Sequence, residues 1–348
     1  MADSLQGAFV LTVEQGGEVI FEARQAVELL AYNEWGGAGY MPELLAAFST
    51  PNDPAIDRVL HGASRILRNA GKTDALDGYK TQSRQRVWEV TSAIYAAIAN
   101  LGLTYAVPPA SFERDGQKIR LPSQILDGRV GTCLDTTMLF AAALEQAGLN
   151  PIVALPKGHA LVGVWLQPDE LNSILVEDAE ILRKLVTLKE LILVETTLVT
   201  SHPTPPMSKA IELAMGTIRE EADATFGAAV DIRRARAHRI MPLGLKVGEH
   251  SAAQEEDEVR IEIALEEAPV LPDFESDKQE ELPDKPEGRL ERWQRRLLDL
   301  SARNPLLNHK SSVASLAILC PDPGELEDRL AAGEKIAISP MPRSSAQE

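Results

Sequence analysis

The sequence contains only two cysteines among its 348 residues, Cys133 and Cys320. They lie far apart and neither belongs to a CxxC pattern, which excludes a disulfide framework and a cysteine-built zinc site. The most apolar stretch, MLFAAALEQAGL at residues 138–149, is interrupted by Glu145 and is too short to span a bilayer. The first residues, MADSLQGAFVLTVE, lack the basic start and apolar run of a secretory signal. We therefore expect a cytoplasmic protein that makes no membrane contact.

The chain also lacks an even spread of charge. Its net charge is −17, and residues 249–288 alone hold fifteen Asp and Glu against three Lys and Arg. An acidic surface repels phosphate backbones, so we expect no direct binding of nucleic acid. A nucleotide loop is missing too, because NAGKT at 69–73 follows Ile66, where a Walker A motif needs its first glycine. We expect neither a cofactor nor a metal.

The remaining patterns divide the chain into four segments. Residues 1–34 alternate as strands do around Gly16-Gly17, which predicts a hairpin that is a remnant of a β-sandwich or a cap on the next segment. Residues 35–245 form the main globular body. Residues 246–288 are acidic and rich in proline, which predicts a mostly disordered linker. Residues 289–348 begin with an amphipathic helix, RLERWQRRLLDLSARN, and continue with a strand and a short helix.

The body combines helical and strand patterns, which predicts an α+β fold. Helices are predicted from PELLAAF, DPAIDRVLHGASRILRNAG, RQRVWEVTSAIYAAIANLG and MSKAIELAMGTIREEADATF. The third of these carries Val87, Val90, Ile94, Ala97 and Ile98 on one face. The segments PIVALP, HALVGVWLQ and ELILVETTLV have the lengths and β-branched content of strands.

Cys133 stands at the start of a helical pattern, in GTCLDTTMLF. A lone cysteine is most often a small core residue, but the first turn of a helix stabilises a thiolate. His159 opens a strand pattern in KGHALVGVW, and Glu195 interrupts the apolar run ILVETTLVT, where a buried carboxylate needs a partner. An imidazole oriented by such a carboxylate can activate a cysteine, which makes Cys133, His159 and Glu195 the candidate catalytic residues.

Several side chains have a second interpretation. Asp178, in LVEDAE, is the alternative acid, although its surroundings are typical of a loop. Gln124 is a candidate oxyanion donor beside the backbone N–H of Cys133, but a surface position is favoured. Trp165 either lines the cleft or packs in the core, with the core favoured. Asp135 lies in the first helical turn, where its negative charge interacts favourably with the helix dipole, and a catalytic role is not needed to explain it.

The stretch from LPSQILDGRVGTCLDTTMLFAAALEQAGLNPIVAL through GHALVGVW to ILVETTLV resembles the core of the transglutaminase-like, papain-type cysteine peptidase superfamily. The resemblance implies a Cys-bearing helix packed on an antiparallel sheet. It also implies that Cys133 is the nucleophile, His159 the base and acid, and Glu195 the orienting residue. Two departures are visible, since Glu replaces the usual Asp and residues 167–190 form an insertion between the histidine and the acid.

The segments NEWGG at 33–37, PPASFERDGQKIRLPS at 108–123 and WQRRLLDLSARNPLLN at 293–308 resemble a bacterial family whose long members carry DUF4011. In those members a transglutaminase-like region precedes a superfamily 1 helicase, and they are associated with phage defence. The resemblance implies that this chain is the N-terminal portion of a longer protein. Its expected partners are a protein or peptide substrate and a helicase region, in the same polypeptide or in another.

Three functions remain open from the sequence. The leading one is hydrolysis of an amide or peptide through a Cys133 thioester. The second is a catalytically inactive module that binds a partner or regulates it. The third is transfer of the acyl group to an amine instead of water. A cluster of Arg233, Arg234, Arg236, His238 and Arg239 is expected to pair with the acidic linker or to face solvent.

Overall fold

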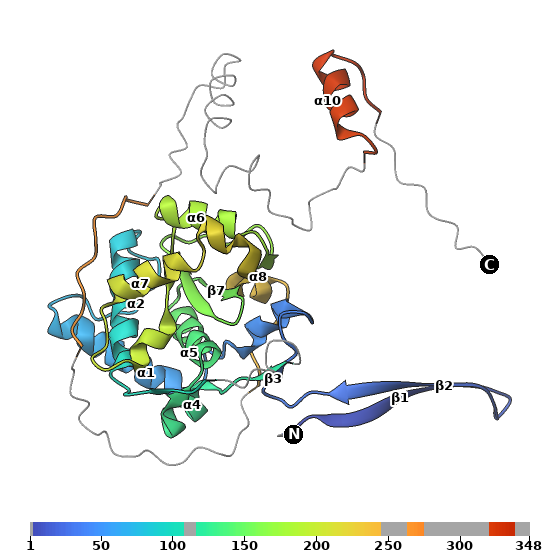
Figure 1. Ribbon diagram of the computed structural model, residues 1–348, viewed down its shortest axis with the longest axis horizontal. Helices are drawn as coiled ribbons and strands as arrows, with labels where there is room; N and C mark the ends of the chain where they lie inside the picture. Colours follow the sequence, from blue (N-terminus) through green and yellow to red (C-terminus); the bar gives the residue numbers. More distant parts are fainter. Residues whose placement is uncertain (1–2, 108–115, 245–262, 275–319, 338–348) are drawn as a thin grey trace. The chain divides into compact units, whose positions relative to one another are not determined.

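The computed structural model describes residues 3–107, 116–244, 263–274 and 320–337 (Figure 1). The chain divides into two compact units, Met1–Lys310 and Ser311–Glu348. In the second unit, helix α10 (Pro323–Ala331) starts at Asp322, whose carboxylate accepts the N–H of Glu325. This is the short helix predicted there. The amphipathic helix and the strand predicted before it lie outside the described residues.

A five-stranded antiparallel sheet lies at the centre of the first unit. Its strand order is β10–β8–β7–β11–β9. The strands are β7 (Pro151–Pro156), β8 (Leu161–Trp165), β9 (Leu175–Val176), β10 (Leu191–Val194) and β11 (Phe226–Asp231). Every residue of β7, β8 and β10 is buried, as expected of strands covered on both faces. The prediction of an α+β fold with an antiparallel sheet is confirmed.

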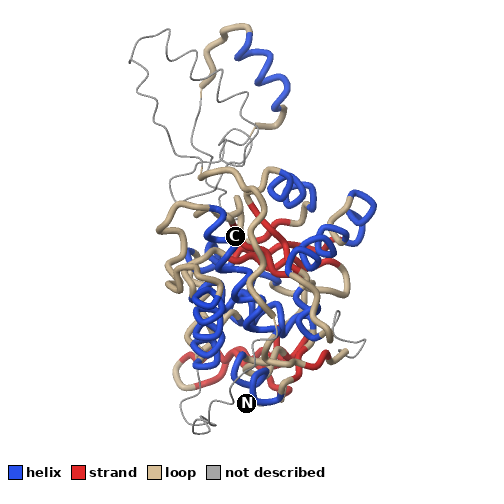
Figure 2. Tube along the Cα trace, turned by 90° about the vertical axis from the view of Figure 1, so that its left-hand side faces the viewer, coloured by secondary structure: helices blue, strands red, loops and turns tan. Residues whose placement is uncertain are grey.

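Helices cover both faces of this sheet, as the strands drawn between helices in Figure 2 show. Side chains alternate along β8, so that Val162 and Val164 join the larger apolar cluster and Leu161 and Trp165 the smaller one. The larger cluster is built with α1 (Pro54–Asn69), α2 (Arg84–Ala99) and α5 (Cys133–Gln146). The remaining helices are η1 (Pro42–Phe48), α4 (Pro122–Gly128), α6 (Ala179–Thr187), η2 (Thr196–Thr200), α7 (Met207–Gly216), η3 (Glu220–Thr225) and α8 (Ile232–Ala237).

Helix α2 is buried on every side, whereas the sequence predicted a single apolar face. Its charged side chains have partners inside the fold, as burial of charge requires. The Arg84 guanidinium donates to Gln167 and to the carbonyl of Lys189, and Glu89 accepts from Lys72. The predicted apolar face is buried in the core, as expected. Burial of the other sides could not be predicted, because helical periodicity does not show partners that come from distant loops.

The helix predicted over residues 207–226 is also shorter than expected. Helix α7 ends at Gly216, and after η3 the chain enters strand β11, which the sequence analysis missed. This strand begins FGAA, and glycine and alanine have low strand propensity. Gly227 is needed at the bulge beside β7, because a Cβ there would lie 2.7 Å from the carbonyl oxygen of Leu155.

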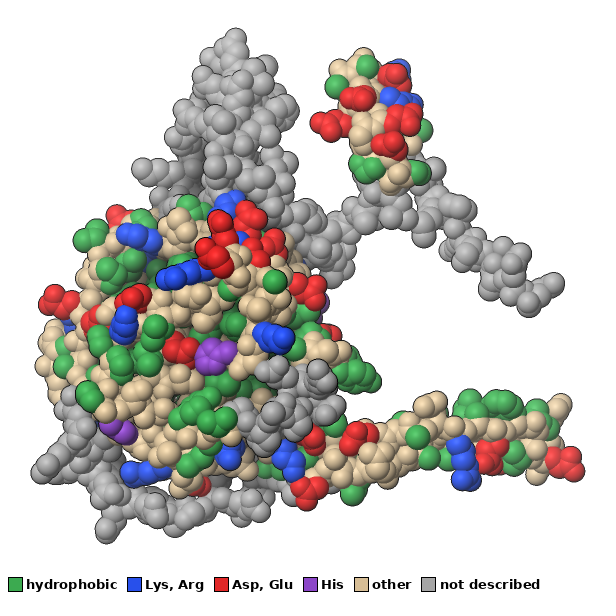
Figure 3. Space-filling model, in the orientation of Figure 1, with side chains coloured by type: hydrophobic (Ala, Val, Ile, Leu, Met, Phe, Trp, Pro, Cys, Tyr) green, Lys and Arg blue, Asp and Glu red, His purple; other side chains and the backbone are tan. Residues whose placement is uncertain are grey.

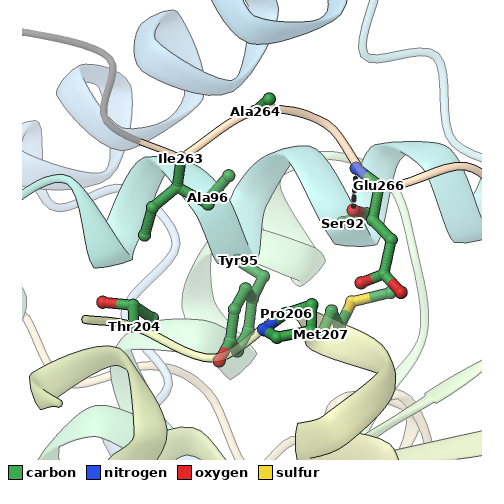
Figure 4. Close-up of a pocket in the computed structure, with 9 residues that line it drawn as sticks. All are labelled: Ser92, Tyr95, Ala96, Thr204, Pro206, Met207, Ile263, Ala264 and Glu266. Carbon is green, nitrogen blue, oxygen red and sulfur yellow. Dashed lines mark hydrogen bonds between the residues drawn. The ribbon is translucent and has the colours of Figure 1, made fainter. Parts of the chain in front are cut away.

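Residues 263–274, which we call the strap, lie extended against the body, although the sequence predicted mostly disorder for this region (Figure 1, orange). The Ile263 N–H donates to Asn100, and the Glu266 carboxylate accepts the N–H of Ser208 at the start of α7. Figure 4 shows the Glu266 backbone bonded to Ser92 of α2. Residues of the strap, of α2 and of the start of α7 line a cavity of about 250 Å³. The strap is held because its apolar side chains are partly buried against the core: Ile263, Leu265, Ala268, Leu271 and Phe274.

The N-terminal hairpin consists of β1 (Leu5–Gln15) and β2 (Glu18–Leu29), joined by Gly16 and Gly17 at positive φ. The predicted turn is therefore confirmed. The cross-strand register places the following apolar side chains on one face: Leu5, Phe9, Leu11, Val13, Phe21, Ala23, Val27 and Leu29. Phe9 is 64% exposed, and hydrophobic side chains are visible along the hairpin in Figure 3. Both strands of the hairpin are exposed almost throughout.

Candidate active site

Cys133 is the first residue of α5, and its helix start is fixed by reciprocal hydrogen bonds. The Thr132 hydroxyl accepts the N–H of Asp135 at 3.2 Å, and the Asp135 carboxylate accepts the N–H of Thr132 at 2.9 Å. Asp135 is fully buried and also accepts two bonds from Arg120, through its backbone and its guanidinium. Asp135 therefore holds the approach to Cys133 in place and has no free oxygen for chemistry.

His159 lies in the turn between β7 and β8. Gly158 has a φ of 74°, which lets the chain reverse tightly, and the N–H of His159 donates to the carbonyl of Pro156 at 3.0 Å. The imidazole is half-buried, bonds the Glu195 carboxylate and lines the same cavity as Cys133. Burial lowers the pKa of His159, but its interactions with Cys133 and Glu195 outweigh burial and raise the pKa to about 10.

Glu195 follows directly after β10 and caps η2. Its Oε2 lies 2.6 Å from His159 Nε2, while its Oε1 accepts the N–H of Thr197 at 3.0 Å and the Thr197 hydroxyl at 2.7 Å. Burial raises the pKa of the Glu195 carboxyl, but the bonds from His159 and Thr197 prevail and the pKa is lowered. A carboxylate beside an imidazolium is therefore the stable state at neutral pH.

The sheet register explains why residues 36 positions apart meet. Strands β8 and β10 are antiparallel, with Val162 opposite Val194. The start of β8 therefore lies beside the end of β10, and the residues just outside each strand share one edge of the sheet. His159 precedes β8 and Glu195 follows β10, so both side chains are brought to this edge.

A buried threonine cluster ties the acid to the cysteine helix. The Thr196 hydroxyl lies 2.9 Å from that of Thr136 and 3.0 Å from that of Thr137, and all three residues are completely buried. Thr196 follows Glu195 in the chain, whereas Thr136 and Thr137 belong to the first turns of α5. These bonds fix the acid and the cysteine helix relative to one another.

Cys133 and His159 line one cavity of about 510 Å³. Three residues that the sequence analysis did not select also line it: Trp35, Tyr105 and Gln117. Two short pairings bring them there, β3 (Glu34–Trp35) with β5 (Gln117–Lys118) and β4 (Thr104–Tyr105) with β6 (Val130–Gly131). Pairs of two residues leave no periodic pattern, so local sequence signals could not have found them.

Tyr105 lines the same cavity as the candidate nucleophile. Burial, followed by the interaction with Cys133 and the charge of Glu195, raises the pKa of the Tyr105 phenol. The phenol therefore keeps its proton and is a hydrogen-bond donor in this cavity. Gln117 is nearby, because its amide donates to the Thr132 hydroxyl at 3.4 Å, one residue before Cys133.

Two alternatives from the sequence are not at this site. Asp178 is exposed and caps α6 by accepting the N–H of Glu180, while His159 has Glu195 as its carboxylate partner. Gln124 is exposed, accepts the N–H of Leu121 and donates to the Tyr32 hydroxyl. Gln124 thus has the surface position that the sequence favoured, and Asp178 begins a helix; neither side chain lines the cavity that holds Cys133 and His159.

The other sequence candidates have structural positions. Trp165 packs in the smaller apolar cluster, as favoured from the sequence. The expected pairing of the basic cluster with the acidic linker is not found among the described residues. Arg236 pairs with Glu145 at 2.8 Å, and Arg233 and Arg234 pair with Glu170.

The part of the chain that the structure describes contains no group of three or more His, Cys, Asp and Glu side chains placed to hold a metal ion. None of the helices in that part is long and apolar enough to cross a membrane.

Comparison with known proteins assigns part of the chain. Residues 296–348 match the family DUF4011, described as a protein of unknown function. No curated protein and no solved structure matches the chain. The DUF4011 part of the resemblance seen in the sequence is thereby confirmed for these C-terminal residues.

Proposed function

We propose that this chain is a cysteine hydrolase with a papain- or transglutaminase-like core, which cleaves an amide or peptide bond through a thioester on Cys133. The single observation that supports the proposal is the cavity shared by Cys133 and His159, with Glu195 bonded to the imidazole from behind. A nucleophile, a base and an orienting acid in hydrogen-bonding sequence are what acyl transfer requires.

The reaction follows from these roles. The Cys133 thiolate attacks the carbonyl carbon, and the resulting oxyanion accepts hydrogen bonds from the backbone N–H of Cys133 and from the Gln117 amide. His159 then gives its proton to the leaving nitrogen, and the C–N bond breaks. Part of the raised pKa of His159 comes from Cys133. Attack by the sulfur forms the C–S bond and removes the negative charge of the thiolate, and with it that contribution, so the imidazolium is a better acid when the leaving nitrogen needs its proton.

Water completes the cycle. His159, now neutral, takes a proton from water as the oxygen attacks the thioester carbon, and the C–S bond breaks to release the acid and the Cys133 thiolate. An amine in place of water would give transamidation by the same steps. Glu195 occupies the Nε2 nitrogen of His159, so that the Nδ1 nitrogen is left for the sulfur throughout the reaction.

The arrangement favours an enzyme over an inactive binding module. A catalytically inactive module would not need a carboxylate, an imidazole and a thiol arranged in this order beside a cavity. We extend the proposal to a longer protein, in which this hydrolase precedes a DUF4011 region and a helicase with a part in phage defence. The match of residues 296–348 to DUF4011 supports that extension.

The second cysteine allows an internal test. Limiting iodoacetamide at pH 7, read by peptide mass spectrometry, should label Cys133 at least about tenfold faster than Cys320, whose thiol donates to the carbonyl of Asp322. Replacing His159 by Gln should abolish the difference, and a Cys320→Ala variant should leave the Cys133 rate unchanged. Equal rates for the two cysteines in the wild-type protein would refute an activated nucleophile.

A further inference from the structure

The cavity beside Cys133 differs in charge from the rest of the molecule. The chain has 52 acidic and 35 basic side chains, yet among the described residues that line the cavity none is Asp or Glu. One lysine lines it, Lys157. Apart from the imidazole of His159, Lys157 carries the only positive charge among the described residues that line the cavity.

Lys157 is anchored by its backbone, while its charge has no partner in the part of the chain that the structure describes. Its N–H donates to the carbonyl of Thr225 at 2.7 Å, and Thr225 lines the same cavity. Among the described residues, none bonds or pairs with its ammonium group, although other lysines such as Lys72 and Lys118 have carboxylate partners. The sequence places it two residues before His159, so their Cα atoms lie at most about 7 Å apart.

The remaining wall of the cavity carries no opposing charge among the described residues. Apolar side chains contribute most of the lining, among them Leu134, Leu155 and Phe226. Lys157 is exposed to solvent at this wall, so its attraction for an opposite charge acts at short range and is screened by salt. Since Lys157 and Cys133 line the same cavity, the ammonium group is suited to select a negatively charged group of a substrate.

We propose that Lys157 is a specificity-determining residue that pairs with a carboxylate of the substrate, carried within about one residue of the bond to be cleaved. The inference rests on the proposed cysteine chemistry and adds the class of substrate to it. The carboxylate has two possible sources, an acidic side chain on the acyl part or a free chain end on the leaving part.

Two small electrophiles test the inference without a known substrate. Iodoacetate and iodoacetamide alkylate the same sulfur and differ in one negative charge. The rate constant for iodoacetate at Cys133, divided by that for iodoacetamide at pH 7 and low salt, reports the local charge. We expect Lys157→Met to lower this ratio about three- to tenfold, Lys157→Arg to keep it, and 0.5 M salt to shrink the difference. Lys80→Met removes an exposed lysine that does not line the cavity and should leave the ratio unchanged.

The outcomes separate the two proposals. Rapid labelling of Cys133 with a ratio that Lys157→Met does not change overturns the role of Lys157 and leaves the hydrolase standing. Labelling of Cys133 no faster than Cys320 overturns both. A ratio that falls equally in Lys157→Met and Lys80→Met also overturns the inference, because only the total charge of the protein would then matter.

Two further probe pairs identify the source of the carboxylate. Peptidyl fluoromethyl ketones with Asp or Asn beside the reactive group test an acidic side chain, and N-acryloylglycine with its amide tests a free chain end. In one of the two pairs, the charged probe should react faster than its neutral counterpart in the wild type and lose this difference in Lys157→Met. That pair identifies the source of the carboxylate. If neither charged probe has such an advantage, the assignment of a carboxylate substrate is wrong.

Discussion

His159 Nε2 lies 2.6 Å from Glu195 Oε2, at the edge where β8 begins and β10 ends. This contact sets the charge state of the imidazole, since Glu195 is one of the two groups that raise the pKa of His159 to about 10. It also gives the buried carboxylate its partner. Changes to this pair, or to the elements that hold it, should therefore alter both reactivity and stability.

Replacing Glu195 by Gln should slow alkylation of Cys133 at pH 7 by about 10- to 100-fold. The amide keeps the shape of the side chain but removes the negative charge, so the pKa of His159 falls and the imidazolium is lost near neutral pH. Rate constants with iodoacetamide from pH 5 to 9 measure this directly. Asp178→Asn is the matched control, because it changes the other candidate acid, which caps α6, and should leave the rate as it is.

Replacing Thr196 by Val should lower the free energy of unfolding by about 1–3 kcal/mol. The substitution keeps the volume but leaves the hydroxyls of Thr136 and Thr137 without their buried partner. Urea unfolding measures the loss, and the alkylation rate of Cys133 should fall as well, since the cluster fixes Glu195 against α5. Thr187→Val on the exposed surface of α6 should change neither quantity. An unchanged alkylation rate in a destabilised Thr196→Val variant would show that the cluster does not position the acid.

Stability should depend on pH through the same pair. The pKa of His159 rises from 6.5 to about 10 on folding, so its contribution is fully present below pH 6.5 and is lost as the pH rises toward 10. The pKa of Glu195 falls below 4.5, so its contribution is present above that value and is lost in acid. Urea unfolding of the wild type and of His159→Gln should therefore differ most near pH 5.5–6.5, and the difference should shrink by about 2–3 kcal/mol by pH 10. A difference that stays constant from pH 6 to 10 would contradict the raised pKa.

The strap should detach when its apolar side chains are shortened. Phe274 packs against Tyr79 with ring centroids 6.4 Å apart, and Leu265 is partly buried. Leu265→Ala and Phe274→Ala should each cost about 1–2 kcal/mol and speed amide hydrogen exchange at Ile263 and Glu266, whose N–H groups bond the body. Val270→Ala is the control within the strap, because that side chain is 90% exposed. Equal exchange in all three variants would mean that these side chains do not hold the strap.

Much of the site could be read from local sequence. The start of α5 follows from Thr132 and Asp135, whose spacing predicts a cap, and the strand patterns around His159 and Glu195 place both near strand ends. Strand order was not readable, so the meeting of these two side chains remained an expectation. Their catalytic roles stay a prediction.

Other parts depend on contacts that no local pattern records. Tyr105 and Gln117 are brought to the cavity of Cys133 by two-residue pairings. Strand β11 begins with small residues and becomes a strand between β7 and β9. The strap has the composition of a disordered linker, yet a groove between α2 and α7 supplies the apolar surface that its own sequence could not predict.

The exposed hairpin has a consequence for handling the protein. Its apolar face carries aromatic and aliphatic side chains in water, and the outer edges of both strands offer unpaired backbone groups. Such a hairpin promotes association of protein molecules as the protein concentration rises. Polar replacements at Phe9 and Phe21 should therefore improve the yield of monodisperse material in gel filtration without disturbing the chemistry at Cys133.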